Sequence, residues 1–190
     1  MKPGFFVTAL AAVTASSLLF NSCSNQPAPQ PPDEHGAVTT MIAVAVRLDA
    51  SGSKTTDTAG VVTVRDTTVV KGKPALEGSL TLERLQFYSV EFHLYDETTS
   101  PRKDLTPDIV GEKDYHRFVV TPKGLAAGAV SLDRFSVDSK GAQFGQGLRV
   151  GAVQNSSGFL NVALRHYDSG DKTSNLYDTD IDRDIPLTVK

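Results

Sequence analysis

Two histidines stand at the ends of predicted strands, where side chains of this type can bind a ligand or a metal ion. His116 begins an apolar row in the predicted strand 115–121, and His166 ends an apolar row in the predicted strand 159–167. In antiparallel neighbours, the start of one strand and the end of the other lie at the same rim of the sheet. We therefore expect the two imidazoles to meet where the core opens to water. The alternative is that both rings close the end of the core and bond to backbone or carboxylate groups.

An acidic row near the C-terminus alternates Asp178, Asp180, Asp182 and Asp184. On a strand these side chains would share one face, and their mutual repulsion would favour a bound cation. Asp178, Asp180 and Asp182 are therefore candidate Ca²⁺ ligands. An EF-hand is excluded, because Arg183 occupies the position of its required glycine. The alternative is a solvated acidic edge that discourages pairing between sheets.

The chain lacks the sequence patterns of catalysis and of nucleic-acid binding. It has no Gly-x-Ser-x-Gly motif, and it has no cysteine besides Cys23 that could act as a nucleophile. Its acidic residues are scattered over turns, so no carboxylate pair for glycoside cleavage stands out. The formal net charge is -3, whereas nucleic-acid binding needs clustered lysines and arginines. We expect neither an enzyme nor a nucleic-acid-binding protein.

Cys23 follows an N-terminal segment with the pattern of a secretory signal. Lys2 supplies a positive charge, residues 5–20 are apolar or small, and Ser22 is the small residue needed before the cleavage point. The apolar run is shorter than the ~20 residues that span a membrane. A lone cysteine at the cleavage point is typical of the lipid attachment residue of a bacterial lipoprotein. We expect a signal peptide at 1–22 and a palmitate-type anchor on Cys23; the alternative is an ordinary cleaved signal with an incidental cysteine.

A proline-rich segment and a strand-rich domain follow the cysteine. The segment 23–37 has no apolar face, so we expect an extended tether. In the domain 38–190, apolar residues recur with a period of two, which predicts strands. The predicted strands are 41–48, 60–65 continuing into 67–70, 79–85, 87–95, 115–121, 130–137, 148–154, 159–167 and 185–189.

These short strands are separated by turn residues, which favours an all-β fold. We expect a single antiparallel, immunoglobulin-like β-sandwich of seven to nine strands. One segment, Leu105 to Val110, departs from the period of two, because Thr106 is suited to cap a helix and Pro107 to occupy its first position. A single helical turn is expected there, crossing from one sheet to the other.

Four stretches of the domain resemble, in order and spacing, a family of small Bacteroidota lipoproteins labelled "type 1 periplasmic binding fold superfamily protein". Residues 96–106 resemble N-E-T-x-S-P-x-x-D-I-T, and residues 115–118 resemble E-H-Q-F. Residues 158–166 resemble G-x-L-x-V-x-L-R-H, and residues 179–182 resemble T-D-I-E. The resemblance implies a lipid-anchored envelope protein. The two-lobed α/β fold that the family label suggests disagrees with the near absence of helical periodicity.

The resemblance adds two carboxylates to the candidate site. Glu97 and Asp180 fall on family-matched stretches, and with His116 and His166 they would form a mixed nitrogen–oxygen site suited to Zn, Cu or Fe. Arg183 departs from the family pattern, because it stands at an apolar position of the last strand. Either that strand begins after Arg183, or the side chain reaches water at the edge of the sandwich.

The expected function is binding without catalysis. We expect a protein that is anchored to the outer membrane by lipid on Cys23 and binds a small ligand, a metal or an outer-membrane partner such as an uptake receptor. The residues of interest are Glu97, His116, His166 and Asp180. The alternative is a structural or adhesive surface module that binds no ligand and whose histidines only close the core.

Overall fold

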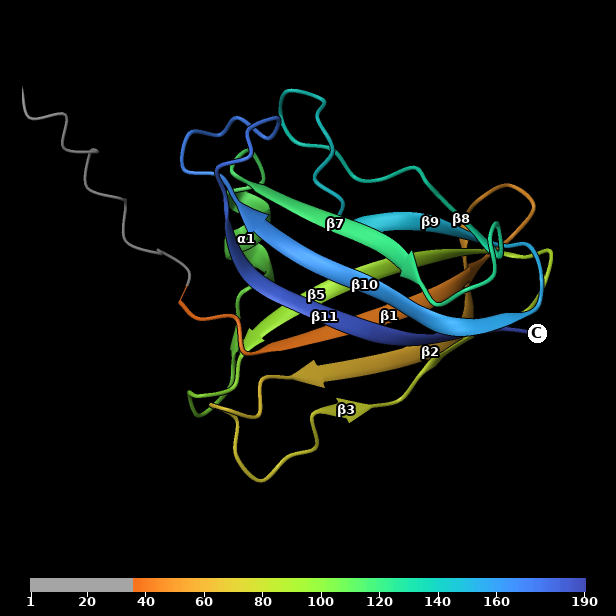
Figure 1. Cartoon of the computed structure of the whole chain (residues 1–190), viewed down its shortest axis with the longest axis horizontal. Helices are drawn as coiled ribbons and strands as arrows, with labels where there is room; N and C mark the ends of the chain where they lie inside the picture. Colours follow the sequence, from red (N-terminus) through yellow and green to blue (C-terminus); the bar gives the residue numbers. More distant parts are fainter. Residues whose placement is uncertain (1–35) are drawn as a thin grey trace, which may run out of the picture. The chain divides into compact units, whose positions relative to one another are not determined.

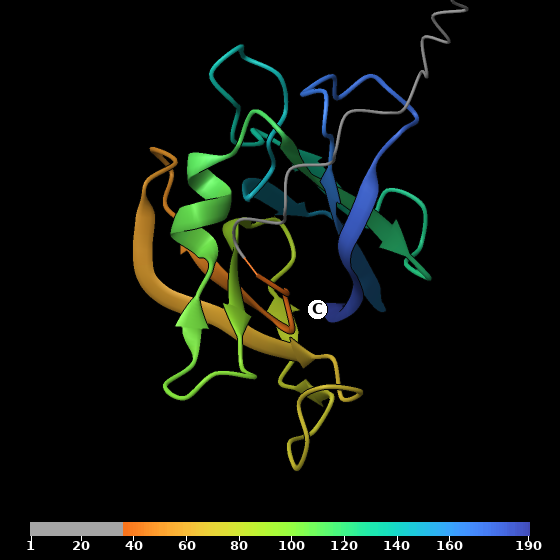
Figure 2. The same cartoon turned by 90° about the vertical axis from the view of Figure 1, so that its left-hand side faces the viewer.

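The computed structural model describes residues 36–190. The predicted signal peptide 1–22, the predicted lipid attachment residue Cys23 and the predicted tether as far as His35 lie outside the described residues. Strands dominate the described part, in which no helix is long and apolar enough to cross a membrane. The strands form two sheets (Figures 1 and 2).

The first sheet contains seven strands and is antiparallel throughout. Its strands, in spatial order, are β3 (Leu76–Glu77), β2 (Lys54–Arg65), β1 (Thr40–Leu48), β5 (Phe87–Asp96), β9 (Gly147–Ala152) and β8 (Val130–Asp133), with β6 (Lys103–Asp104) paired beside β5. The chain forms the β1–β2 hairpin, returns with β5 on the other side of β1, and adds the β8–β9 pair beyond β5. β1 and β5 therefore form the centre of this sheet.

The second sheet contains four strands. They are, in spatial order, β4 (Leu80–Leu82), β11 (Asp178–Val189), β10 (Ser156–His166) and β7 (His116–Lys123). β10 pairs antiparallel with both of its neighbours, whereas β4 runs parallel to β11. This parallel pair is the exception to the antiparallel prediction.

The short helix α1 (Thr106–Gly111) connects the first sheet to β7 in the second, as predicted. Proline stands in its first turn, where a missing backbone N–H leaves no helical hydrogen bond unmade. Thr106 does not cap the helix, so that part of the prediction is wrong. Its hydroxyl oxygen instead accepts a hydrogen bond from the backbone N–H of Leu94 at 2.9 Å and ties the helix to β5.

Alternation along the strands buries one face of each sheet in a shared core. In β5, Val90, Phe92 and Leu94 are fully buried, and the residues between them are partly exposed. The Phe92 ring stacks on the Phe118 ring of β7 with 5.6 Å between centroids, so the inner faces of the two sheets contact each other. The predicted all-β sandwich is confirmed.

Several predicted strand boundaries are wrong, and the described residues form eleven strands where seven to nine were expected. β2 begins at Lys54 rather than at residue 60, and β8 ends at Asp133 rather than at residue 137. Residues 67–70 form a turn rather than a strand, because the Asp66 carboxylate accepts hydrogen bonds from both the N–H and the hydroxyl of Thr68. The last strand begins at Asp178, earlier than predicted, so Arg183 lies inside it. The Arg183 side chain is 30% exposed and reaches the Asp66 carboxylate, with 3.5 Å between Nη2 and Oδ2. It therefore reaches water at the sandwich edge, the second of the two alternatives.

Candidate functional site

The two histidines meet at the end of the second sheet, as predicted. β7 and β10 pair without a bulge, and His116 lies directly opposite His166 in this register. Both side chains continue the inward-facing rows of their strands. Their rings stack with 4.7 Å between centroids and 11° between planes. The predicted register and the predicted meeting of the imidazoles are confirmed.

The histidine pair is enclosed by oxygen atoms. His116 is fully buried; its Nδ1 lies 3.1 Å from the backbone carbonyl oxygen of Glu112. Its Nε2 lies 3.6 Å from Oδ2 of Asp180. The side chain of His166 is 15% exposed, and its Nδ1 lies 3.8 Å from a carboxylate oxygen of Asp168. This arrangement agrees with the expectation that the rings close the core and contact backbone and carboxylate groups.

A β-bulge brings Asp180 to the histidines. Leu164 pairs with Ile181 and Arg165 pairs with Thr179, which leaves Asp180 as the extra residue of β11. The bulge changes the alternation of side chains at this point, so the Asp180 carboxylate approaches the inward-facing ring of His116. The predicted proximity of Asp180 to this histidine is confirmed.

The same bulge separates the acidic row, so the prediction of one shared acidic face is wrong. Asp182 and Asp184 lie on the other face, where the side-chain amide of Asn161 donates to both carboxylates at 2.7 and 2.9 Å. The Lys123 ammonium also binds Asp184, at 2.7 Å. Hydrogen bonds from Lys123 and Asn161 lower the pKa of Asp184. The Ca²⁺ set of Asp178, Asp180 and Asp182 is therefore not assembled.

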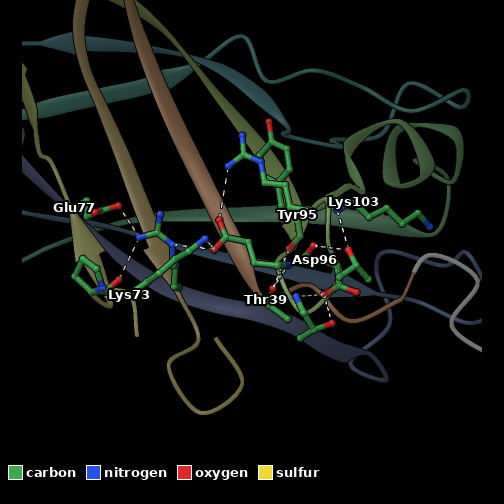
Figure 3. Close-up of polar contacts among 12 residues, drawn as sticks. Thr39, Lys73, Glu77, Tyr95, Asp96 and Lys103 are labelled. Carbon is green, nitrogen blue, oxygen red and sulfur yellow. Dashed lines mark hydrogen bonds and ion pairs between the residues drawn. The ribbon is translucent and has the colours of Figure 1, made fainter. Parts of the chain in front are cut away.

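Glu97 does not join the histidines. Its carboxylate, only 2% exposed, lies at the end of β5 among Arg65, Lys73 and Arg102, at 3.2, 2.8 and 3.7 Å (Figure 3). Its backbone N–H donates to the Thr39 hydroxyl, just before β1 begins. Glu97 therefore joins the first residues of the sandwich to β2 and β5, which is a structural role.

Electrostatics within this cluster favour the ionised form of Glu97. Burial alone would raise the pKa of the carboxyl group, but the hydrogen bonds and charges of Lys73 and Arg65 outweigh burial and lower it. Burial likewise opposes the charge of Arg65, and the carboxylates of Glu77 and Glu97 overcome that effect and raise its pKa. A glutamate that a cation cluster already neutralises is a poor metal ligand.

The stacked histidines are also poorly arranged to share one metal ion. Two imidazoles that bind one zinc ion must aim nitrogen lone pairs at a common point about 2.0–2.1 Å away. Nearly parallel, stacked rings direct their lone pairs along separate planes. Within residues 36–190, no group of three or more His, Cys, Asp or Glu side chains could hold a metal ion. The predicted Zn, Cu or Fe site is therefore not formed by Glu97, His116, His166 and Asp180 as they lie here.

Two adjoining hollows on the outer face of the first sheet are the part of the surface that the sequence analysis missed. Their volumes are about 210 and 310 Å³, and they share Leu48, Gly52, Arg134 and Arg149. Phe87 lines the smaller hollow. Neither histidine lines them. We call the two hollows together the outer groove.

One sequence signal could have indicated the outer groove. Phe87 and Arg149 both occupy outward positions, one residue before a buried residue of β5 or β9. The Arg149 guanidinium lies over the Phe87 ring, 4.6 Å from its centroid. It also forms two hydrogen bonds of 2.6 Å with Asp133, which raise the pKa of Arg149 and lower that of Asp133. To recognise this pair, one must know that β5 lies beside β9, and the strand pattern alone does not predict that.

The hollows and the histidine pair are thus separate features of the sandwich, one open and one closed. Comparison of the chain with protein-family models, with curated proteins and with solved structures gives no match.

Proposed function

We propose that the chain is a lipid-anchored, non-catalytic binding protein of a bacterial cell envelope. The observation that carries the binding function is the outer groove, which is open and contains the guanidinium of Arg134. The anchor is supported by the position of Cys23 after an apolar run and by the resemblance to Bacteroidota lipoproteins. The outer membrane is the expected location.

Binding without catalysis is supported by where the reactive side chains lie. Cys23 is the only cysteine, and as the lipid attachment residue it leaves no thiol nucleophile. Histidine is the usual general base, but His116 and His166 are stacked on each other, and neither they nor His93 line the outer groove. The two carboxylates that line the groove are engaged elsewhere, because Asp49 accepts hydrogen bonds from Ser51 and Ser53 and Glu91 is paired with Lys54.

Two measurements on the full chain test the proposal. Metabolic labelling with a palmitate analogue should mark the wild-type chain and leave Cys23→Ser unmarked; absence of label on the wild-type chain would disprove the anchor. A thermal-shift screen of small organic anions, cations and neutral compounds, on the detergent-solubilised chain, should find at least one ligand that raises Tm with dose. A screen in which no compound stabilises the chain would count against a ligand-binding function.

A structural or adhesive module is the second candidate, and the histidine pair is the observation that favours it. His116 is fully buried and contacts the carbonyl of Glu112, so this end of the core is closed. A module of that kind would lose stability when His116 is replaced, and no ligand of the screen would change its Tm. The thermal-shift screen therefore separates the two candidates.

A further inference from the structure

We propose that the outer groove binds a carboxylate-bearing ligand with an apolar body, and that Arg134 is the residue that binds the carboxylate. This inference rests on the proposed binding function and names the chemistry of its ligand. It is carried by the ion pairs of the groove, which leave Arg134 out, by the backbone of Arg134 and by the apolar wall beside it.

The ion pairs of the groove include two of its three cations. Lys54 is paired with Glu91, and Arg149 is held by two hydrogen bonds to Asp133. Arg134, which is exposed, forms no salt bridge within residues 36–190. A guanidinium presents a planar fork of N–H donors that matches a carboxylate in two parallel hydrogen bonds. The groove therefore offers one guanidinium that is not held in an ion pair and whose fork of donors suits a planar anion.

The remaining charged group favours an anion of charge -1. Asp49 lines the smaller hollow, and its Oδ1 accepts hydrogen bonds from the N–H and hydroxyl of Ser51 and from the N–H of Ser53. These bonds lower the pKa of Asp49, so it stays ionised and repels a second negative charge. A phosphate dianion would find only one free guanidinium, whereas a carboxylate needs no more.

The backbone of Arg134 is strained at the point from which its side chain extends. Its φ is 48°, in the left-handed region that non-glycine residues rarely adopt. A strained backbone is often found where a side chain must be aimed at a ligand. The Arg134 Nη1 atom lies 3.5 Å from the point that a Cβ on Gly52 would occupy, so the guanidinium lies against the β1–β2 turn, between the two hollows.

An apolar wall adjoins the charge. Phe87 is 45% exposed, and its ring lies across the outward face of Gly151, where a Cβ would come within 2.9 Å of the ring. Leu48 lines both hollows. The glycine opposite Phe87 in the register thus leaves room for the ring beside β9. An apolar body attached to the carboxylate would rest on Leu48 and on the part of Phe87 that Arg149 and Gly151 leave exposed.

Another hollow, of about 410 Å³ between β2 and β4, is larger than either hollow of the groove, but its arginine is already engaged. Its arginine, Arg47, lies 3.7 Å from Glu83 and donates a hydrogen bond to Gln86 at 3.0 Å. Volume alone therefore does not select the site, whereas the unpaired guanidinium of Arg134 does.

The test is an NMR titration of the detergent-solubilised full chain with phenylacetate, observing the arginine Nε–H signals. Phenylacetate should shift the Arg134 signal to saturation with a Kd of about 1 mM, the range for a ligand of this size. Phenylacetamide, which lacks the charge, and acetate, which lacks the apolar body, should each bind at least about tenfold more weakly. Inorganic phosphate should bind no better than acetate.

Three variants separate charge from strain. Arg134→Ala and Arg134→Gly should both weaken phenylacetate binding at least about tenfold, and Arg134→Gly, which relieves the left-handed backbone, should keep the wild-type Tm or exceed it. Arg84→Ala is the matched control: Arg84 is also exposed, forms no salt bridge in the described part of the chain and lies outside the groove. Arg84→Ala should leave binding unchanged.

Several outcomes would overturn the inference. They are a titration without saturation up to about 20 mM, equal binding of phosphate, or binding that survives within threefold in Arg134→Gly. A ligand from the thermal-shift screen that binds Arg134→Ala as well as wild type would leave the binding function standing and reject only the carboxylate site. Loss of palmitate labelling would concern only the anchor.

Discussion

Replacement of Glu97 by Gln should destabilise the sandwich by about 3 kcal/mol, because it leaves a buried guanidinium without one of its carboxylates. The side chains of Glu97 and Arg65 are only 2% and 10% exposed, and Nε of Arg65 lies 3.2 Å from Oε2 of Glu97. Removal of one member of a buried ion pair typically costs about 3–5 kcal/mol. Glu77 remains 2.6 Å from Arg65, so the lower end of that range applies.

The other cations of the cluster add little to this figure. Lys73 and Arg102 are 50% and 48% exposed, so water screens their attraction to Glu97, and each contributes at most about 1 kcal/mol. For a domain of this size, 1 kcal/mol corresponds to about 2–4 °C in Tm. Glu97→Gln should therefore lower Tm by about 6–12 °C.

Urea denaturation of the two variants Glu97→Gln and Glu77→Gln supplies the decisive comparison. Glu77 binds the same guanidinium, but its side chain is 51% exposed, so Glu77→Gln should cost no more than about 1 kcal/mol. If the two variants lose the same free energy of unfolding, burial of the Glu97–Arg65 pair is not what stabilises the cluster, and the reasoning fails.

Acid should remove the stability that the ionised Glu97 contributes. The pKa of Glu97 lies below its usual value of 4.5 in the folded chain, so folding favours the ionised carboxylate. The resulting stability is fully present above the unfolded pKa and is lost as pH falls through the folded pKa. The difference in free energy of unfolding between wild type and Glu97→Gln should be constant from pH 7 to about 5.5 and shrink below about pH 4. A difference that grows on acidification would have the wrong sign.

The remaining predictions concern the closed end of the core, the strand glycines and a buried lysine. His116→Ala should lower the free energy of unfolding in urea by about 3 kcal/mol, because the ring is fully buried. Equimolar Zn²⁺ should not raise the wild-type Tm. A stoichiometric zinc effect that the variant abolishes would reinstate the metal site. Gly151→Ala should destabilise the fold by about 2 kcal/mol, since the added Cβ would lie 2.5 Å from a serine hydroxyl. Gly147→Ala is the control: the nearest neighbour of its Cβ would lie at 3.5 Å, so its stability should be within about 0.5 kcal/mol of wild type. Equal Tm values for the two variants would contradict this. Lys172→Met should cost about 3 kcal/mol, because its ammonium binds Asp138 at 2.7 Å and the two side chains are only 5% and 2% exposed; a loss below 1 kcal/mol would show that the pair is not stabilising.

Strand periodicity was sufficient to predict the sandwich and the meeting of His116 and His166. A period of two fixes which side chains face the core, and an uninterrupted antiparallel pair fixes which residues lie opposite each other. β7 and β10 have no bulge, so these two rules led directly to the observed register. The prediction succeeded because the chain follows the regular geometry in this pair.

The prediction of one shared acidic face failed because the strand geometry is irregular at that point. A bulge adds one residue and reverses the alternation beyond it, and nothing in the sequence around Asp180 marks the point of insertion. Glu97 was misplaced because its partners, Arg65 and Lys73, are distant in the chain and reach it only through the pairing of β1 with β2 and β5. Periodicity describes each strand separately and does not predict the order of the strands in a sheet.

The outer groove was missed because it depends on turns and on the left-handed backbone of Arg134. Turn residues in the sequence indicate that the chain reverses, but they do not indicate which turns lie together in space. The β1–β2 turn and Arg134, which follows β8, line the same groove although more than eighty residues separate Gly52 from Arg134 in the sequence. Such a site becomes visible only with the sheet assembled.

The Glu97 cluster and the outer groove lie toward opposite ends of β1, which makes a last prediction about their independence. Thr39, bound to Glu97, precedes the first residue of β1, and Leu48, which lines the groove, is its last. A strand of this length spans on the order of 30 Å. Changes so far apart and without shared contacts are additive within about 0.3–0.5 kcal/mol.

Glu97→Gln should therefore lose stability and still bind phenylacetate with a Kd within about twofold of wild type at 15 °C, where the variant stays folded. Arg134→Ala should show the reverse, weak binding at nearly unchanged Tm. If Glu97→Gln weakened binding as much as Arg134→Ala does, the groove would depend on the ordering of the first residues of the sandwich. The proposed tether would then be coupled to the ligand site, and the independence inferred from the separation of the two sites along β1 would be wrong.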